Sequence, residues 1–225
     1  MSQGRPKHLG SSMVILSEVF LSIQGESTYA GLPCVFVRLA GCNLSCSWCD
    51  TPYARESSAG SEVPVSAVIK DVKRFNVPLV EITGGEPLLQ AGAKALGARL
   101  IKAGYRVLIE TNGSVSLKGL DKKIVKVVDV KCPSSGQSGS FLMDNLCHIT
   151  DADEVKFVVG NTVDYDFACK FIEEHIQDRT DNILLAAVKQ KLPPKELAEW
   201  ILRDNLKARL QLQLHTYIWG EERGR

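Results

Sequence analysis

The sequence predicts an α/β protein, folded as a partial, incomplete TIM-like barrel of about six parallel βα units with an N-terminal extension. Short apolar stretches alternate with stretches of helical periodicity along the chain, which favours a parallel sheet with right-handed crossovers. Six or seven such units are too few to close an eight-fold barrel. The chain has 225 residues and is 44% hydrophobic, enough for one well-buried domain.

The first elements surround a cysteine-rich loop. Residues 1–12 are polar and rich in small side chains, so we expect a disordered leader before a single domain over residues 13–225. Val14–Ile23 and Cys34–Leu39 are rich in branched apolar residues and predict strands. After the loop, Pro64 opens a helix whose apolar positions recur with helical spacing up to Phe75.

The later elements continue the alternation. Strands are predicted at Leu79–Thr83, Tyr105–Glu110, Lys126–Val130, Glu154–Val159, Asn182–Val188 and Leu210–Leu214. Helices are predicted from Leu89 to Ala103, with Gly104 ending the helix, and over Asp164–Ile176 and Pro194–Asn205.

Polar and glycine-rich segments follow several of these strands. They are the cysteine loop, Thr83–Glu86, Glu110–Ser114 and Lys131–Gln137. In a parallel α/β sheet, ligands bind at the carboxyl ends of the strands. Four such segments on one face predict a binding site there.

Charge and cysteine usage narrow the class of protein. The 27 Lys+Arg nearly balance the 26 Asp+Glu, so we expect neither a general nucleic-acid binder nor a membrane-surface binder. No apolar run approaches the roughly 20 residues of a membrane span. Seven cysteines are an odd number, and three of them fall within eight residues. This pattern favours a metal site in a reducing cytoplasm over a disulfide scaffold.

Three thiols share one loop, in the pattern Cys42-x3-Cys46-x2-Cys49. Soft thiolates select zinc or iron–sulfur clusters. A structural zinc normally needs four protein ligands, and the sequence offers no second pair. Three ligands to a [4Fe–4S] cluster leave one iron open for a substrate. Cys34 and Cys169 lie in apolar segments and are expected to be buried, whereas the roles of Cys132 and Cys147 stay open.

The Cx3Cx2C spacing, with Trp48 before the third cysteine, is similar to the signature of the radical S-adenosylmethionine (SAM) superfamily. From about Val14 to Trp219 the chain resembles the 7-carboxy-7-deazaguanine synthase family. The motifs that carry the resemblance are IQGE at Ile23, VFVRLAGCNL at Val35, CDT at Cys49, TGGEP at Thr83, ETNGS at Glu110, KCPSSG at Lys131 and QLH at Gln213. Activases of glycyl-radical enzymes, the alternative enzyme class, share the cysteines but not IQGE.

The resemblance implies conversion of 6-carboxy-5,6,7,8-tetrahydropterin to 7-carboxy-7-deazaguanine with loss of ammonia, in queuosine-type biosynthesis. It implies a [4Fe–4S] cluster, SAM and Mg²⁺ as cofactors. The expected partners are a flavodoxin or ferredoxin as electron donor and a second copy in a homodimer. No catalytic side chain is expected, because the cofactor generates the radical. A zinc- or cluster-bearing binding module is the non-enzyme alternative.

The same resemblance assigns roles to residues. Cys42, Cys46 and Cys49 would hold the cluster, and Thr51 would bind Mg²⁺. The residues expected at the cofactor are Trp48, Cys49, Asp50, Gly85, Ser135, Gly136 and Gln137. Those expected at the substrate are Ile23, Gln24, Gly25, Arg38, Thr83 and His215.

Arg38 also stands out without the resemblance. It lies inside the apolar run Val35–Ala40, where an unpaired charge would be costly. We expect its guanidinium to bind the substrate carboxylate, the alternative being an ordinary pair with a glutamate. Residues Gly220–Arg225 extend beyond the family's terminal strand, so a contact made there by other members is expected to be lost or replaced.

Overall fold

The structure is a computed structural model that describes residues 12–220 and 222–224. The expected leader therefore lies outside the described residues, except for Ser12. The Ser12 carbonyl accepts a hydrogen bond of 2.8 Å from the Val65 amide, which ties the start of the described chain to the domain.

One nine-stranded sheet runs through the molecule in the order β3-β1-β2-β4-β5-β6-β7-β8-β9. The strands are β1 Met13–Ile23, β2 Pro33–Leu39, β3 Ser61–Pro64, β4 Leu79–Gly84, β5 Arg106–Thr111, β6 Val125–Asp129, β7 Glu154–Val159, β8 Ile183–Ala187 and β9 Arg209–Gln211. From β2 to β9 all neighbours pair in parallel, whereas β1 and β3 form an antiparallel extension. The predicted incomplete barrel is confirmed.

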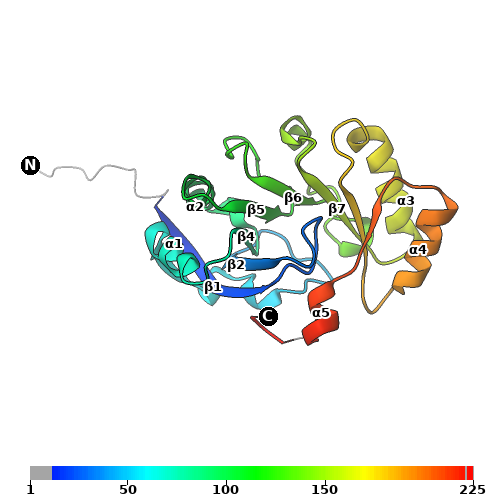
Figure 1. Cartoon of the computed structure of the whole chain (residues 1–225). Coiled ribbons are helices and arrows are strands. Elements are labelled where there is room, and N and C mark those ends of the chain that lie inside the picture. Colours follow the sequence, from blue (N-terminus) through cyan, green and yellow to red (C-terminus); the bar gives the residue numbers. More distant parts are fainter. Residues whose placement is uncertain (1–11, 221, 225) are drawn as a thin grey trace, which may run out of the picture.

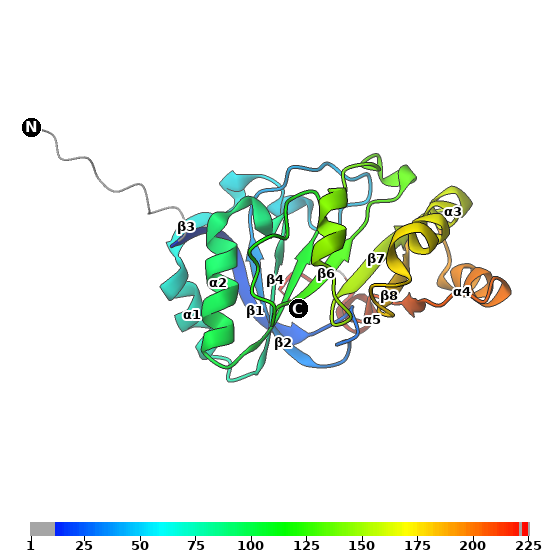
Figure 2. The ribbon, with the colours of Figure 1, turned by 90° about the horizontal axis from the view of Figure 1, so that it is seen from above.

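Helices cover the outer side of the curved sheet (Figures 1 and 2). They are α1 Val65–Lys73, α2 Ala91–Lys102, α3 Thr162–Phe171 and α4 Pro194–Arg203. A short fifth helix, α5 Leu214–Trp219, lies at the bottom of the view in Figure 1. Among the described residues, no helix is long and apolar enough to cross a bilayer.

Alternation along the parallel strands separates the core from the concave face, because successive side chains point to opposite sides of a sheet. On the outer side, Val37, Ile82 and Ile109 belong to the main apolar cluster. The intervening positions face inward and carry polar groups that line one cavity. These are Arg38, Glu81, Thr83, Glu110, Asp129 and Lys156.

The structure corrects three predicted elements. The last strand ends at Gln211 and not at Leu214, since Leu214 opens α5 and its amide donates to the Gly25 carbonyl at 2.9 Å. The helix predicted over Asp164–Ile176 is α-helical only to Phe171 and continues as a π-turn over Ile172–Ile176. The sequence prediction also missed β3, which pairs with the start of β1.

Candidate active site

A cavity of about 770 Å³ occupies the concave side of the sheet. Its walls come from the ends of strands β1, β2 and β4 to β8, from the cysteine loop, and from residues of the C-terminal segment. The predicted site residues that line it are Ile23, Gln24, Arg38, Cys42, Cys46, Trp48, Cys49, Asp50, Thr51, Thr83, Gly85 and His215. Gly25, Ser135, Gly136 and Gln137 are not among the lining residues. Residues from five motifs therefore meet in one place.

The glycine motif after β4 holds the start of the cysteine loop. A Cβ on Gly85 would stand 2.2 Å from the Gly41 carbonyl oxygen, so only glycine allows this approach. The Glu86 amide donates to the same oxygen at 2.8 Å. The buried Glu86 carboxylate in turn accepts hydrogen bonds from the Thr111 hydroxyl and the Asn112 amide. Strands β4 and β5 thus fix the backbone just before Cys42.

The three thiols of the loop fit an iron–sulfur cluster with one open iron. Burial raises the pKa of the Cys46 and Cys49 thiols, and ligation of the thiolates would release their protons. Within the described ranges, no three His, Cys, Asp or Glu side chains converge tightly enough for a single metal ion. A [4Fe–4S] cluster does not require the three thiols to converge on one point, because each thiolate binds a different iron.

The loop after β6 packs behind the cysteine loop. The Ser135 carbonyl accepts from the Ser47 amide at 3.0 Å and from its hydroxyl at 3.1 Å. On the neighbouring residue, the Trp48 ring lies 4.8 Å from the Lys191 ammonium, within cation–π range. Cys132, at the start of the loop after β6, is buried in the main apolar cluster and does not line the cavity.

Two hard oxygen donors follow Cys49. The Thr51 hydroxyl donates to Asp50 Oδ1 at 2.7 Å, and both residues line the cavity. Hydroxyl, carboxylate and water oxygens are the ligands that Mg²⁺ prefers. This pair could therefore hold a divalent cation beside the cluster loop.

Arg38 is paired with a glutamate and still faces the cavity. Its partner across the strands is Glu18, whose Oε1 accepts from Arg38 Nε at 2.9 Å and from the Tyr53 hydroxyl at 2.9 Å. Burial alone would raise the pKa of Glu18, but these two hydrogen bonds, together with the charges of nearby arginines, lower the pKa. A guanidinium carries five N–H donors, so Arg38 can bind a second carboxylate through its terminal nitrogens.

A buried lysine organises the acidic wall opposite. Lys156 pairs with Glu26 and, at 2.8 Å, with Glu110, and only 6% of its side chain is exposed. Burial would raise the pKa of Glu110, but the charge and hydrogen bond of Lys156, together with Lys131 and Thr83, lower it to about 2. Gln213 and Thr83 complete the wall, donating to Glu26 at 2.8 Å and to Glu110 at 3.1 Å.

Glu81 behaves differently from its neighbour Glu110. It accepts a hydrogen bond from the Gln24 side-chain amide. Burial and the nearby charge of Glu110 raise its pKa to about 8, so its protonated form dominates at neutral pH. The site therefore offers the ionised carboxylate of Glu110 beside a neutral carboxylic acid. Of the groups in this wall, only Gln24 and Thr83 were among the predicted site residues.

Gly25 contributes to the site indirectly, because its lack of a side chain makes room for helix α5. A Cβ at this position would stand 2.0 Å from His215 Nδ1. The absence of a side chain thus lets the first turn of α5 reach the end of β1. His215 lines the cavity from this helix, which the sequence analysis did not predict.

Comparison with known proteins first gives the class. A model of the radical SAM superfamily matches residues 37–131, the segment that runs from β2 through the cysteine loop to Lys131. The crystal structure of QueE from Escherichia coli superposes with a TM-score of 0.74 at 23% identity, covering 88% of this chain and 94% of that one. The chain is a radical SAM enzyme.

Two relatives then give the particular family. A 7-carboxy-7-deazaguanine synthase of Koribacter versatilis is 40% identical over 222 residues, covering 92% of this chain and 97% of the relative. One from Chlorobaculum tepidum is 41% identical over 215 residues, with 92% and 94% covered. The chain belongs to the 7-carboxy-7-deazaguanine synthase family, whose superfamily works with a [4Fe–4S] cluster and SAM.

Proposed function

We propose that this enzyme converts 6-carboxy-5,6,7,8-tetrahydropterin to 7-carboxy-7-deazaguanine and ammonia. The observation that carries the proposal is that Arg38 lines the same cavity as Cys42, Cys46 and Cys49. Substrate and product differ by ammonia alone, so the conversion needs no net oxidant. Bound at the three thiols, the cluster would supply the electron that cleaves SAM and so initiates hydrogen removal from the substrate.

The substrate carboxylate would bind Arg38. Arg38 Nε already donates a hydrogen bond of 2.9 Å to Glu18, and this bond fixes the plane of the guanidinium. A bidentate pair with the two terminal nitrogens would orient the pterin with its carboxyl-bearing carbon at one place in the cavity. Charge-assisted pairs of this kind are about twice as strong as neutral hydrogen bonds.

The aminopyrimidinone edge of the pterin would face the polar wall. That edge offers N–H donors, and the side-chain oxygens of Glu110 and Glu26 can accept hydrogen bonds from them. Neutral Glu81 and Gln24 can each donate as well as accept, and so suit its carbonyl and ring nitrogens. Lys156 keeps Glu26 and Glu110 in place, since it pairs with both.

Cofactor contacts follow the same layout. Trp48, Asp50 and Gly85 would contact SAM. Ser135, Gly136 and Gln137 do not line the cavity, and they would support the adenosine side by holding the cysteine loop at Ser47. Thr51 would bind Mg²⁺, supported by its hydroxyl and the adjacent Asp50 carboxylate, 2.7 Å apart.

The proposed partners and compartment rest on the family and on cysteine chemistry. We propose a flavodoxin or ferredoxin as electron donor and a homodimer as the working form. Light scattering of the purified protein would test the dimer. All seven cysteines are free thiols, which suits a reducing cytoplasm.

The decisive assay gives the reduced, cluster-loaded protein SAM, Mg²⁺ and carboxytetrahydropterin under anaerobic conditions. The expected products are 7-carboxy-7-deazaguanine and ammonia, with neither formed by Cys46→Ala. Formation of 5′-deoxyadenosine without a deazaguanine would support radical cleavage of SAM but refute the proposed substrate. Zinc without sulfide in the purified protein would refute both.

A further inference from the structure

A second cation, besides Arg38 itself, reaches the Glu18 carboxylate that holds Arg38. Arg223, from the C-terminal segment, donates its Nε–H to Glu18 Oε2 at 3.1 Å, across 205 positions of the chain. Its guanidinium also stacks over the Tyr53 ring, with 4.0 Å between Cζ and the ring centroid. Tyr53 itself donates to Glu18 Oε1. Arg223 therefore contacts both groups that surround Arg38.

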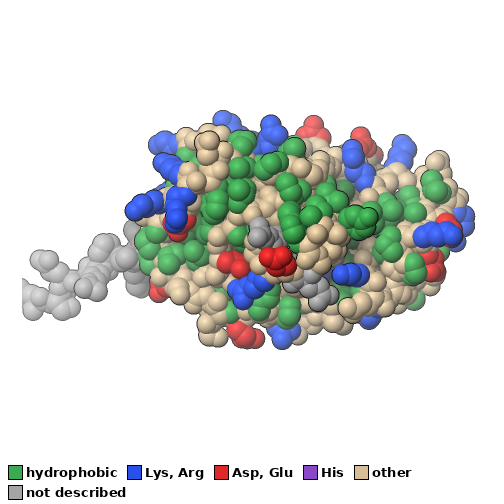
Figure 3. Space-filling model, turned by 60° about the horizontal axis from the view of Figure 1, so that its bottom comes forward, with side chains coloured by type: hydrophobic (Ala, Val, Ile, Leu, Met, Phe, Trp, Pro, Cys, Tyr) green, Lys and Arg blue, Asp and Glu red, His purple; other side chains and the backbone are tan. Residues whose placement is uncertain are grey.

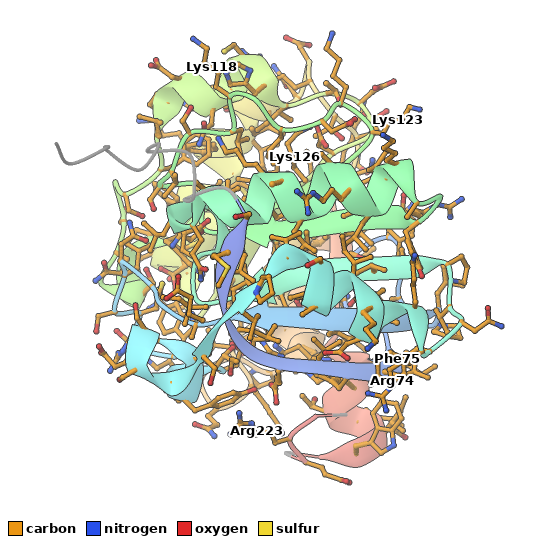
Figure 4. All side chains as sticks on the ribbon, turned by 90° about the vertical axis from the view of Figure 1, so that its left-hand side faces the viewer. Arg74, Phe75, Lys118, Lys123, Lys126 and Arg223 are labelled. Atoms are coloured by element: carbon orange, nitrogen blue, oxygen red, sulfur yellow. The ribbon has the colours of Figure 1, made fainter. Side chains whose placement is uncertain are left out.

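The C-terminal segment reaches the cavity and not merely the outer surface. Gly220, Glu222 and Gly224 line it together with Arg38 and Tyr53. Figure 4 shows Arg223 at the lower edge of the molecule, and Figure 3 shows acidic and basic side chains interspersed on the face turned toward the viewer. Arg223 lies at the rim, with 55% of its side chain exposed, whereas Arg38 is 16% exposed.

The two oxygens of Glu18 have different partners. Oε1 accepts from Arg38 and Tyr53, and Oε2 accepts from Arg223. With Oε2 engaged, the carboxylate is held in one orientation, and Oε1 presents a fixed acceptor to Arg38 Nε. Without Arg223, the carboxylate could rotate and offer either oxygen, or both, to Arg38. A bidentate Glu18–Arg38 pair would then occupy donors that a substrate carboxylate needs.

We propose that Arg223 is a positioning residue for the binding of the substrate carboxylate. It acts through Glu18 and Tyr53 and keeps the terminal nitrogens of Arg38 directed to the ligand. This inference rests on the proposed function, because it requires a carboxylated substrate at Arg38. It also assigns a role to the extension beyond Trp219.

The test compares Arg223→Ala with Arg223→Lys in the cluster-loaded, full-length enzyme. Arg74→Ala is the matched control, since Arg74 lies at the end of α1, is 77% exposed and pairs only loosely with Asp71 at 3.7 Å (Figure 4). Arg223→Ala should raise the KM and Kd for carboxytetrahydropterin by about fivefold to tenfold, a modest effect because the pair is half exposed. The kcat and the KM for SAM should stay within about twofold, and Arg223→Lys should recover part of the loss.

Two further experiments distinguish a positioning role of Arg223 from a role in merely closing the cavity. Tetrahydropterin without the carboxylate should bind wild type and Arg223→Ala equally. In a Glu18→Gln background, removing Arg223 should add less than about twofold to KM, because its partner is already changed. Equal weakening of both pterins, additive effects, or an unchanged KM in Arg223→Ala would each overturn the inference. If wild type makes no deazaguanine, the proposed function fails instead, and this inference falls with it.

Discussion

Replacing Lys156 with methionine removes the cation that holds the acidic wall together. The side chain is 6% exposed and pairs with Glu26 and Glu110. Methionine has a similar length, so the main change is the loss of charge. The half-buried carboxylates of Glu26 and Glu110 would then lose the cation that pairs with both, which costs stability.

The magnitude follows from the pKa of Glu110. Against the effect of burial, Lys156, with smaller contributions from Lys131 and Thr83, lowers this pKa from 4.5 to about 2, which corresponds to roughly 3 kcal/mol at about 1.4 kcal/mol per unit. Because the pKa is lowered on folding, the stabilisation is fully present above pH 4.5 and is lost as the pH falls through about 2. At pH 7 Lys156→Met should therefore lower the free energy of unfolding by about 3 kcal/mol, and Tm by roughly 6–12 °C.

Circular dichroism melts of the anaerobically loaded protein at pH 7 would measure this change. Lys195→Met is the control, since Lys195 is 87% exposed and its distance to Glu199 is 3.8 Å; its Tm should move by less than about 1 °C. The double variant Lys156→Met/Glu110→Gln should recover at least about half of the loss, because one unpaired charge is gone. A Tm for Lys156→Met within about 2 °C of wild type, or no recovery in the double variant, would refute the reasoning.

Three other predictions concern the pH profile, the cluster loop and the metal. Folding raises the pKa of Glu81 to about 8, so its contribution to stability is greatest below pH 4.5 and is lost as the pH rises through 8. Glu81→Gln should therefore flatten the fall of Tm between pH 5 and 9. An unchanged slope would contradict this. Gly85→Ala places a Cβ 2.2 Å from the Gly41 oxygen, so iron and sulfide content should drop by more than about half, whereas full occupancy would show that the loop tolerates the shift. Thr51→Ala should abolish most of the Mg²⁺ stimulation with iron content unchanged, and normal stimulation would remove Thr51 as a ligand.

The sequence predicted the sheet and the cysteine loop well because both depend on local patterns. Apolar runs such as Cys34–Leu39 are short, and the three cysteines fall within eight residues of one loop. Boundaries were less accurate at the C-terminus. There Leu214 opens α5 through a contact with Gly25, and no local pattern encodes a contact between the two ends of the domain.

The acidic wall was missed although a signal was present. Glu81, Glu110 and Lys156 each lie next to apolar residues within a strand, as Arg38 does. A charge in such a run needs a partner, yet only Arg38 was predicted to lie in the site on this ground. Together with the two-residue alternation of strands, the same reasoning places all four on one face. The Arg223–Glu18 contact had no such signal, because it joins residues 205 positions apart.

The most direct test of the account follows a single hydrogen atom. Carboxytetrahydropterin deuterated at C6 would be turned over by the reduced enzyme with SAM and Mg²⁺, and the SAM and 5′-deoxyadenosine would be analysed by mass spectrometry. If Arg38 holds the substrate carboxylate in the cavity that the cluster thiols line, deuterium should appear in the adenosyl group, and Arg38→Ala should reduce its transfer more than tenfold. Product formed with no deuterium in the adenosyl group would contradict the account.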